Sequence, residues 1–274
     1  MKRIMLHGGG CSAYGVYHGL FESLGVGLDD FVKTELVTAS AGSMYLMKML
    51  HDFVAGETDA SSEKIERMHK NLFESVSIWE ALEDQNGFLC SQKKLQEELS
   101  QIMDEHEKVR NITFKSLHDR LPNLKLVVLA TGVRDGTWYL KRFSADETPH
   151  VRVFDACLAS MSVPILFEPV TIDGELFCDA DCMTKNEYAD ESTWHINCRQ
   201  HEIRDVLSKL SVNIPLIDTI VQFVANLWKL TVTKTPERMT IQHEFQSSVL
   251  QSPMKEEYIQ CGKTLAGRFM VKKA

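Results

Sequence analysis

The stretch RIMLHGGGCSAYGVYHGL, from Arg3 to Leu20, decides the expected fold of this chain. Its first residues, Arg3 to His7, form a short apolar run typical of a buried strand, and three glycines end it. Apolar residues then recur with helical spacing from Val16 to Leu24, which predicts a helix that buries one face. Gly15 and Gly19 lie four residues apart and would let the backbone of this helix pack closely against another element.

The stretch ELVTASAGSM, from Glu35 to Met44, repeats the pattern. Glu35 to Ala39 predicts a second strand, and a helix is expected from about Ala41 to Phe53. Strand, glycine turn, helix, strand, tight turn and helix in this order predict a parallel sheet with helices on its faces. Neighbouring strand-to-helix loops of such a sheet open at the same carboxyl edge, so Ser40 would face the glycine loop.

The other elements follow from periodicity and turn residues. Leu124 to Ala130, LKLVVLA, is the strongest strand of the chain, and TGVRDG after it is expected to be a turn. Asp173-Gly174 is expected to be the two-residue turn of a hairpin. The remaining expected elements are helices over most of Ser61–Leu121, a strand over Trp138–Phe143, a helix over Phe154–Met161, the hairpin over Pro169–Asp179, and helices near Ile203–Leu210 and Leu216–Val232.

The expected fold class is therefore α/β, with three layers in the order α/β/α around a central, largely parallel sheet. Extra helices are expected as an insertion at about 61–121 and at the C-terminus. The sequence shows no internal repeat and no linker that would force a second domain. We therefore expect a single domain over 1–274, with a core over about 1–186 and a C-terminal helical extension over about 200–274.

Composition limits the classes of protein and partner. Apolar residues make up 44% of the 274 residues and charged residues 25%, which is ordinary for a soluble globular protein with a large core. The net charge of −8 argues against a nucleic-acid partner. The seven cysteines have no regular spacing and no secretory signal precedes them, so free thiols in the cytoplasm are expected.

Leu216 to Val232 is the longest apolar-rich segment of the chain. Polar residues interrupt it at steps of three and four residues, which predicts an amphipathic helix and not a transmembrane span. Packing against the core or over the site is the favoured role of this helix, and contact with a membrane interface is the alternative.

The loop HGGGCSAYG, from His7 to Gly15, places backbone N–H groups at the positive end of a helix. Gly8, Gly10 and Ala13 match a dinucleotide-binding pattern, but the second strand ends in VTAS, without the acidic residue that this pattern needs. A phosphate-binding loop would need Gly-Lys followed by Ser or Thr, which the loop lacks. An oxyanion hole is the favoured interpretation, and a purely structural turn remains the other one.

TASAG, from Thr38 to Gly42, places a serine among small residues at a tight strand-to-helix turn, the setting of a nucleophile elbow. Its position beside the glycine loop favours Ser40 as an attacking hydroxyl over a merely structural serine. A serine needs a base to remove its proton. None of the ten histidines stands in a context that singles it out, so the alternative base is a carboxylate.

A metal site is the other chemistry that the sequence suggests. His195, Cys198 and His201 have the spacing H-x-x-C-x-x-H, and Cys182 would be a fourth ligand. The spacing matches no standard zinc finger, and the pattern of this segment indicates a helix or irregular structure. We therefore expect neither a metal nor another cofactor.

The segment FDACLASMSVPILFEPVTIDGELFCDAD, from Phe154 to Asp181, closely resembles the patatin-like phospholipase family. Typical members carry A-S-x-S-x-P-x-x-F-x-P-V, then I-D-G, then a strand that ends in D-G-G. The resemblance covers residues 1 to about 186 and includes the order of glycine loop, elbow and central strand, Leu126 to Gly136. The matching residues are Ala159, Ser160, Ser162, Pro164, Phe167, Pro169, Val170, Ile172, Asp173 and Gly174.

The resemblance implies a serine–aspartate dyad, without histidine, that hydrolyses acyl esters of lipids. Ser40 would attack the carbonyl, and Asp179 would handle the proton. Backbone N–H groups of the glycine loop, at Gly8, Gly9, Gly10 and Cys11, would hold the oxyanion. The implied activity is that of a phospholipase A on phospholipids or other acyl-ester lipids, at the surface of a membrane to which the protein binds peripherally.

The chain departs from the family pattern at several positions. Thr38 replaces the first glycine of the elbow, and Cys11 to Ala13 hold no Arg or Lys. DAD, from Asp179 to Asp181, replaces D-G-G. Either the charge of Asp181 would raise the pKa of Asp179 by like-charge repulsion, or the Asp181 side chain would point to water. These departures leave a second hypothesis open: a catalytically inactive relative that binds lipid or serves as a scaffold.

Overall fold

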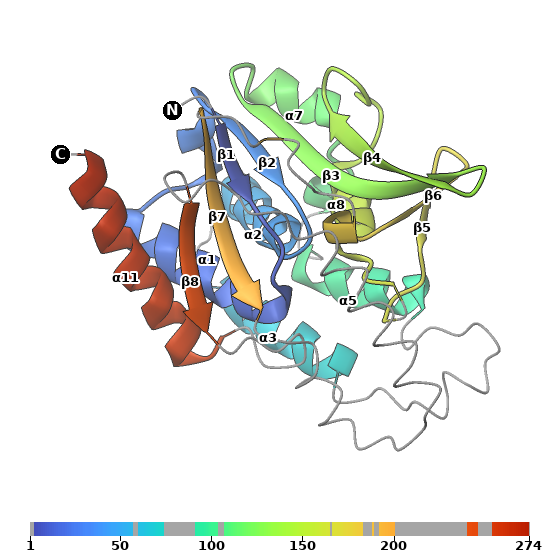
Figure 1. Ribbon diagram of the computed structural model, residues 1–274. Helices are drawn as coiled ribbons and strands as arrows, with labels where there is room; N and C mark the ends of the chain where they lie inside the picture. Colours follow the sequence, from blue (N-terminus) through green and yellow to red (C-terminus); the bar gives the residue numbers. More distant parts are fainter. Residues whose placement is uncertain are drawn as a thin grey trace, which may run out of the picture.

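The structure is a computed structural model that describes residues 3–56, 60–73, 91–103, 107–164, 166–182, 188, 192–200, 240–245 and 254–273. The described residues form one eight-stranded sheet in the order β5-β6-β3-β2-β1-β7-β8, with β4 beside β3 (Figure 1). The strands are β1 (Arg3–Leu6), β2 (Glu35–Thr38), β3 (Lys125–Arg134), β4 (Thr137–Ser144), β5 (Val170–Ile172), β6 (Glu175–Cys178), β7 (Thr193–Gln200) and β8 (Thr240–Phe245).

Helices flank this sheet. Those that the structure describes are α1 (Gly10–Leu24), α2 (Ala41–Ala55), α3 (Ala60–Phe73), α5 (Gln92–Met103), α6 (Glu107–Arg110), α7 (Phe114–Arg120), α8 (Val153–Met161) and α11 (Glu256–Lys273). Two short 3-10 helices, η1 (Leu28–Phe31) and η2 (Ala180–Cys182), complete the list. None of the described helices combines the length and the apolar character that crossing a membrane requires.

The sheet is mixed but mostly parallel. β3, β2, β1, β7 and β8 run parallel to one another. β4 and β6 are antiparallel to β3, and β5 is antiparallel to β6. The strand–loop–helix alternation of the first fifty residues places β1 and β2 side by side in the middle. The predicted fold class, an α/β fold with a central, largely parallel sheet and flanking helices, is confirmed.

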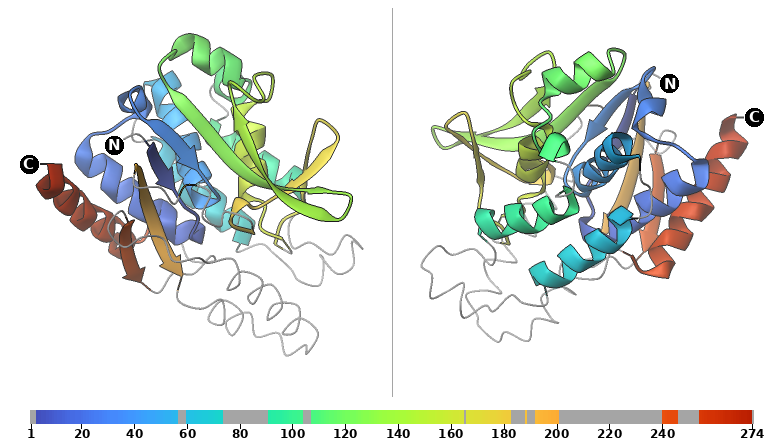
Figure 2. Two further views of the ribbon diagram at one scale, coloured as in Figure 1. Left: turned by 45° about the horizontal axis from the view of Figure 1, so that its top comes forward. Right: turned by 180° about the vertical axis from the view of Figure 1, so that it is seen from behind.

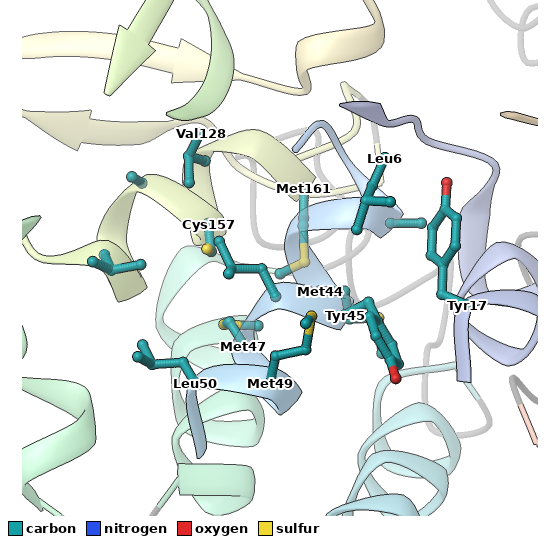
Figure 3. Close-up of a cluster of buried hydrophobic side chains, with 14 of the residues drawn as sticks. Leu6, Tyr17, Met44, Tyr45, Met47, Met49, Leu50, Val128, Cys157 and Met161 are labelled. Carbon is teal, nitrogen blue, oxygen red and sulfur yellow. The ribbon is translucent and has the colours of Figure 1, made fainter. Parts of the chain in front are cut away.

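The larger apolar core lies between the sheet and the helices α1, α2 and α8. Alternation along the strands sends Leu36 of β2 and Val128 of β3 to this face. Figure 3 shows the methionines of α2, Met44, Met47 and Met49, close to Cys157 and Met161 of α8 beneath the sheet. Unbranched methionine side chains fill irregular gaps of this kind. This packing fixes α2, and with it the turn that begins the helix.

The C-terminal helix α11 packs along α1 (Figures 1 and 2). A methyl group added at Gly19 would lie 2.0 Å from the carbonyl oxygen of Ile259, and one added at Gly262 would lie 2.1 Å from that of Val16. The two backbones therefore touch where a glycine stands on each helix. The close packing that the sequence predicted for Gly19 is confirmed, and α11 is the element that it contacts.

Three sequence expectations differ from the structure. TGVRDG is not one turn: β3 continues to Arg134, and only Asp135-Gly136, both with positive φ, form the turn to β4. The segment 193–200, expected to be helical or irregular, is strand β7 between β1 and β8. Strand β8 was not predicted at all. The helices expected near 203–210 and 216–232 lie outside the described residues.

Candidate active site

Two strands run toward each other along one edge of β3. The last residue of β2 pairs with Val128, and the last residue of β6 pairs with Thr131. Because β4 occupies the opposite edge of β3 over Val127–Arg134, β2 and β6 must share the remaining edge. β2 is parallel and β6 antiparallel to β3, and three residues of a strand span only about 10 Å. Ser40, two residues after β2, and Asp179, directly after β6, therefore both lie near the gap between the two strand ends on this edge of β3.

Ser40 has a backbone conformation that L-residues rarely adopt. Its φ of 50° and ψ of −119° lie outside the usual regions, and it stands at the N-cap of α2. The N–H groups of Ser43 and Met44 donate to its carbonyl oxygen at 2.8 and 3.2 Å, so the helix begins directly after it. Gly42 permits the turn, because a methyl group there would lie 2.4 Å from the carbonyl oxygen of Leu6. This is the sharp strand-to-helix turn that a nucleophile elbow requires.

The glycine loop between β1 and α1 also needs its glycines. Gly9 has a φ of 144° and Gly10 a φ of 64°, conformations that favour glycine. The loop leads into the N-terminus of α1, where backbone N–H groups carry partial positive charge. Cys11 is buried, and burial raises the pKa of its thiol to about 12. Its side chain is therefore a neutral thiol, and only its backbone N–H suits an anion.

Gly8 is the residue of the glycine loop that lies against Ser40. A methyl group added at Gly8 would lie 2.8 Å from Cβ of Ser40 and 1.8 Å from Oδ2 of Asp181. Both side chains therefore converge on the bare Cα of Gly8. Any larger residue at this position would push the loop away from Ser40.

Asp179 follows β6 and is fully buried. Its N–H donates to the carbonyl oxygen of Ser162 at 2.9 Å, and its carbonyl oxygen accepts from the Thr131 hydroxyl at 2.8 Å. Its Oδ1 accepts a hydrogen bond of 2.8 Å from the N–H of Asp181. The backbone and one carboxylate oxygen are thus held from three directions, as a catalytic carboxylate requires.

Asp181 does not point to water, one of the two outcomes that the sequence left open. Its side chain is half-buried and lies against Gly8. The family pattern has a glycine at this position. Compared with the family pattern, Asp181 therefore adds a carboxylate next to the glycine loop. The negative charge of an oxyanion would have to form beside the same loop.

The histidine nearest to the glycine loop along the chain, His7, is turned to another partner. Its Nε2 lies 2.8 Å from Nδ1 of His195 on β7, whose Nε2 lies 3.0 Å from the carbonyl oxygen of Tyr188. Burial, with a smaller contribution from His195, lowers the pKa of His7 to about 3. A group with that pKa is a poor proton acceptor at neutral pH.

The structure places His195 and Cys198 on strand β7. Among the residues that the structure describes, no group of three or more His, Cys, Asp or Glu side chains is placed to hold a metal ion. His201 lies outside the described residues. The buried cysteines Cys11, Cys157, Cys178 and Cys261 are free thiols, as predicted.

Sequence reasoning missed Thr131 as a support of Asp179, and it did not predict the contact between His7 and His195. Thr131 was assigned to a turn, although its hydroxyl supports Asp179 from within β3. The signal for it was the DG pair at 135–136, which predicts a hairpin and therefore a longer strand. His7 and His195 are 188 residues apart in the sequence, and no local pattern predicts their contact.

Comparison with known proteins places this geometry in context. The family model for patatin-like phospholipases matches residues 4–182. No curated protein sequence matches the chain. The crystal structure of VipD from Legionella pneumophila is similar over 98% of this chain and 66% of its own, with a TM-score of 0.51 and 16% identity. ExoU in its complex with SpcU, from the type III secretion system of Pseudomonas aeruginosa, is similar over 99% of this chain and 51% of its own, with a TM-score of 0.43 and 17% identity. The chain spans about half to two thirds of the length of these structures.

Proposed function

Because the chain belongs to the patatin-like phospholipase family, a family of lipid ester hydrolases, we propose that it is a phospholipase A that cleaves membrane phospholipids with Ser40 and Asp179. The observation that carries this proposal is the head-on approach of β2 and β6 along β3, which directs the strand ends before Ser40 and before the buried Asp179 toward the same stretch of β3. The strained backbone of Ser40 and the bare Cα of Gly8 beside it add support.

In the proposed mechanism Ser40 Oγ attacks the ester carbonyl and its proton passes to the carboxylate of Asp179. The negative charge on the carbonyl oxygen is held by backbone N–H groups of the glycine loop, among Gly8, Gly9, Gly10 and Cys11. The C–O bond to the alcohol then breaks, and the alcohol leaves with the proton from Asp179. A water molecule, deprotonated by the same carboxylate, releases the fatty acid and restores Ser40. No histidine is needed, in line with the low pKa of His7.

Two substitutions test this mechanism. Ser40→Ala removes the nucleophile and Asp179→Asn removes the base, so each should lower the rate of phospholipid hydrolysis by at least about 1000-fold. The measurement is mass spectrometry of the products from a mixed phospholipid panel, with circular dichroism to confirm that each variant is folded. Turnover by Ser40→Ala at the wild-type rate would rule out the mechanism.

The position of Asp181 supports a second candidate, a catalytically inactive relative that binds lipid or serves as a scaffold. Its carboxylate lies beside Gly8, where it would oppose the growth of negative charge on a substrate oxygen. Asp181→Asn keeps the shape and removes the charge. If the wild type is silent and Asp181→Asn hydrolyses phospholipid, Asp181 is the cause of the silence. If both are silent but bind lipid vesicles, the scaffold hypothesis stands.

We further propose that the protein works in the cytoplasm, bound peripherally to a membrane. Among the described residues the exposed large apolar side chains are Val133, Trp138 and Leu176. Val133 pairs with Trp138 on one side and with Leu176 on the other, so the three form one row on one face of the sheet. Thr131, which supports Asp179, lies on the same face of β3. Tryptophan favours the boundary between lipid and water.

The membrane proposal predicts that Trp138→Glu combined with Leu176→Glu weakens vesicle binding by about tenfold or more, because both side chains lose their apolar contact with lipid. Cosedimentation with phospholipid vesicles measures the binding. Hydrolysis of a soluble short-chain ester serves as the control and should keep its rate. Unchanged sedimentation of the double variant would contradict contact through this row.

A further inference from the structure

A row of buried hydroxyl groups lies directly behind the candidate nucleophile. Thr38 Oγ1 is 3.0 Å from Ser43 Oγ, and Ser43 Oγ is 2.9 Å from Ser160 Oγ. Ser160 Oγ accepts a hydrogen bond of 3.0 Å from the backbone N–H of Ser40. All three hydroxyl side chains are fully buried, and they come from β2, α2 and α8.

We propose that this row positions Ser40, and that Thr38 is a positioning residue for the reaction. The inference rests on the proposed role of Ser40 as the nucleophile. Thr38 stands where the family pattern has a glycine, and from sequence it looked like a crowded replacement. In the structure the Thr38 hydroxyl is the first group of a hydrogen-bonded row whose last member, Ser160, accepts from the amide of Ser40.

The amide of Ser40 needs such a partner for a physical reason. The positive φ of Ser40 is strained, and a strained backbone persists only where its surroundings hold it. The residue is also almost completely buried, so its N–H cannot turn to water without moving the elbow. Ser160 supplies the acceptor, and its hydroxyl is fixed in turn by Ser43.

The row also ties together three elements that would otherwise set the elbow independently. β2 ends at Thr38, α2 begins after Ser40, and α8 carries Ser160 near its C-terminus. Hydrogen bonds that share hydroxyl groups polarise and orient one another, so removing one member loosens the rest. A hydroxyl at position 38 should therefore matter more than the shape of the side chain that carries it.

Two substitutions at one position separate the hydroxyl from the shape. Thr38→Val keeps the branched shape and removes the hydroxyl, whereas Thr38→Ser keeps the hydroxyl and removes the methyl group. Thr148→Val is the matched control, because Thr148 is also a buried threonine whose hydroxyl is hydrogen-bonded, but to Ser144 and away from the site. Ser160→Ala removes the acceptor of the Ser40 amide directly.

The measurements are kcat and KM for a soluble ester, the rate of labelling by a fluorophosphonate, and hydrogen exchange at the Ser40 amide. We expect Thr38→Val and Ser160→Ala to lower kcat and the labelling rate by about tenfold, the scale of one buried hydrogen bond, with KM almost unchanged. Exchange at the Ser40 amide should accelerate in both variants. Thr38→Ser should stay within about twofold of the wild type, and Thr148→Val should change only the thermal midpoint.

Each outcome decides the inference. Equal kcat and equal Ser40 exchange in Thr38→Val and Thr38→Ser would overturn it, because the hydroxyl would then do nothing for Ser40. If the wild type neither hydrolyses esters nor labels at Ser40, the proposed function fails, and amide exchange decides the positioning claim by itself. In that case unchanged exchange in Thr38→Val and Ser160→Ala would overturn it, and faster exchange would support it.

Discussion

Ser40 shows how one residue can depend on contacts from most of the core. Its turn is possible because Gly42 passes within contact of the Leu6 carbonyl, where any Cβ would clash. Its amide is held by Ser160, more than a hundred residues away in sequence. The first contact has a local sequence signal, the small residues around the serine. The second has none, since nothing near Ser40 indicates which distant hydroxyl will reach it.

His7 makes the free energy of unfolding depend on pH. Burial and His195 hold its pKa at about 3, below the unfolded value of 6.5, so the folded protein keeps His7 neutral. As the pH falls below 6.5 the unfolded chain binds a proton that the folded chain does not, and stability is lost down to about pH 3. His7 alone should cost about 2 kcal/mol between pH 7 and pH 5.

Urea unfolding of the wild type and of His7→Gln at pH 7 and pH 5 measures this contribution. Glutamine does not titrate, so the variant should lose about 2 kcal/mol less than the wild type over this interval. An equal loss in the two proteins would show that His7 is protonated in the folded state as readily as in the unfolded one.

The site residues differ in how far the sequence alone could predict them. Ser40 and the glycine loop have local patterns, and the structure gives them the tight turns and positive φ angles that those patterns favour. Asp179 had no such pattern and was assigned only through the family resemblance. Thr131 and Ser160 were missed as supports, because their roles depend on pairings between β3, β6 and α8 that no single segment encodes.

At the scale of elements, the contact between α1 and α11 gives the sharpest stability prediction. Gly262→Ala should lower the free energy of unfolding by about 2 kcal/mol or more, because the new methyl group would meet the backbone of α1. Gly267 lies on the same helix with open space around its Cα. Gly267→Ala should therefore raise stability by up to about 1 kcal/mol through helix propensity.

Thermal unfolding of the two alanine variants, side by side with the wild type, checks this prediction. The two changes are chemically identical and lie in one helix, so propensity alone would move both midpoints upward. A higher midpoint for Gly262→Ala than for the wild type would contradict the close packing of α11 on α1.

Elements with strong local patterns were predicted well, and those defined by pairing were not. The two opening strand–helix units, the β3 core and the 173–174 turn all have local signals, and the structure confirms them. The length of β3 was underestimated because its end is stabilised by β4 and β6 on its two edges. The sequence prediction for β7 is wrong although the segment does carry a strand signal: Trp194, Ile196 and Cys198 alternate with polar residues. β7 pairs with β1 and β8 in the sheet.

At the scale of the whole molecule, the proposed function depends on one topological feature. A parallel sheet brings successive loops to one edge, which the sequence predicted for the glycine loop and Ser40. The arrival of Asp179 depends on β6, which enters the same edge of β3 from the opposite direction. The Asp173-Gly174 hairpin gives β6 the direction opposite to β5, but where this hairpin joins β3 could not be derived from the turn alone.

The central claim is that Ser40 is a nucleophile activated by Asp179, and covalent labelling tests it most directly. The purified protein is treated with a fluorophosphonate, and the modified peptide is identified by mass spectrometry, with Asp179→Asn and Ser40→Ala treated in parallel. A single stable adduct on Ser40, formed at least about 100-fold more slowly in Asp179→Asn, is the predicted result. An adduct on another serine, or none on folded protein that turns over phospholipid, would contradict the claim.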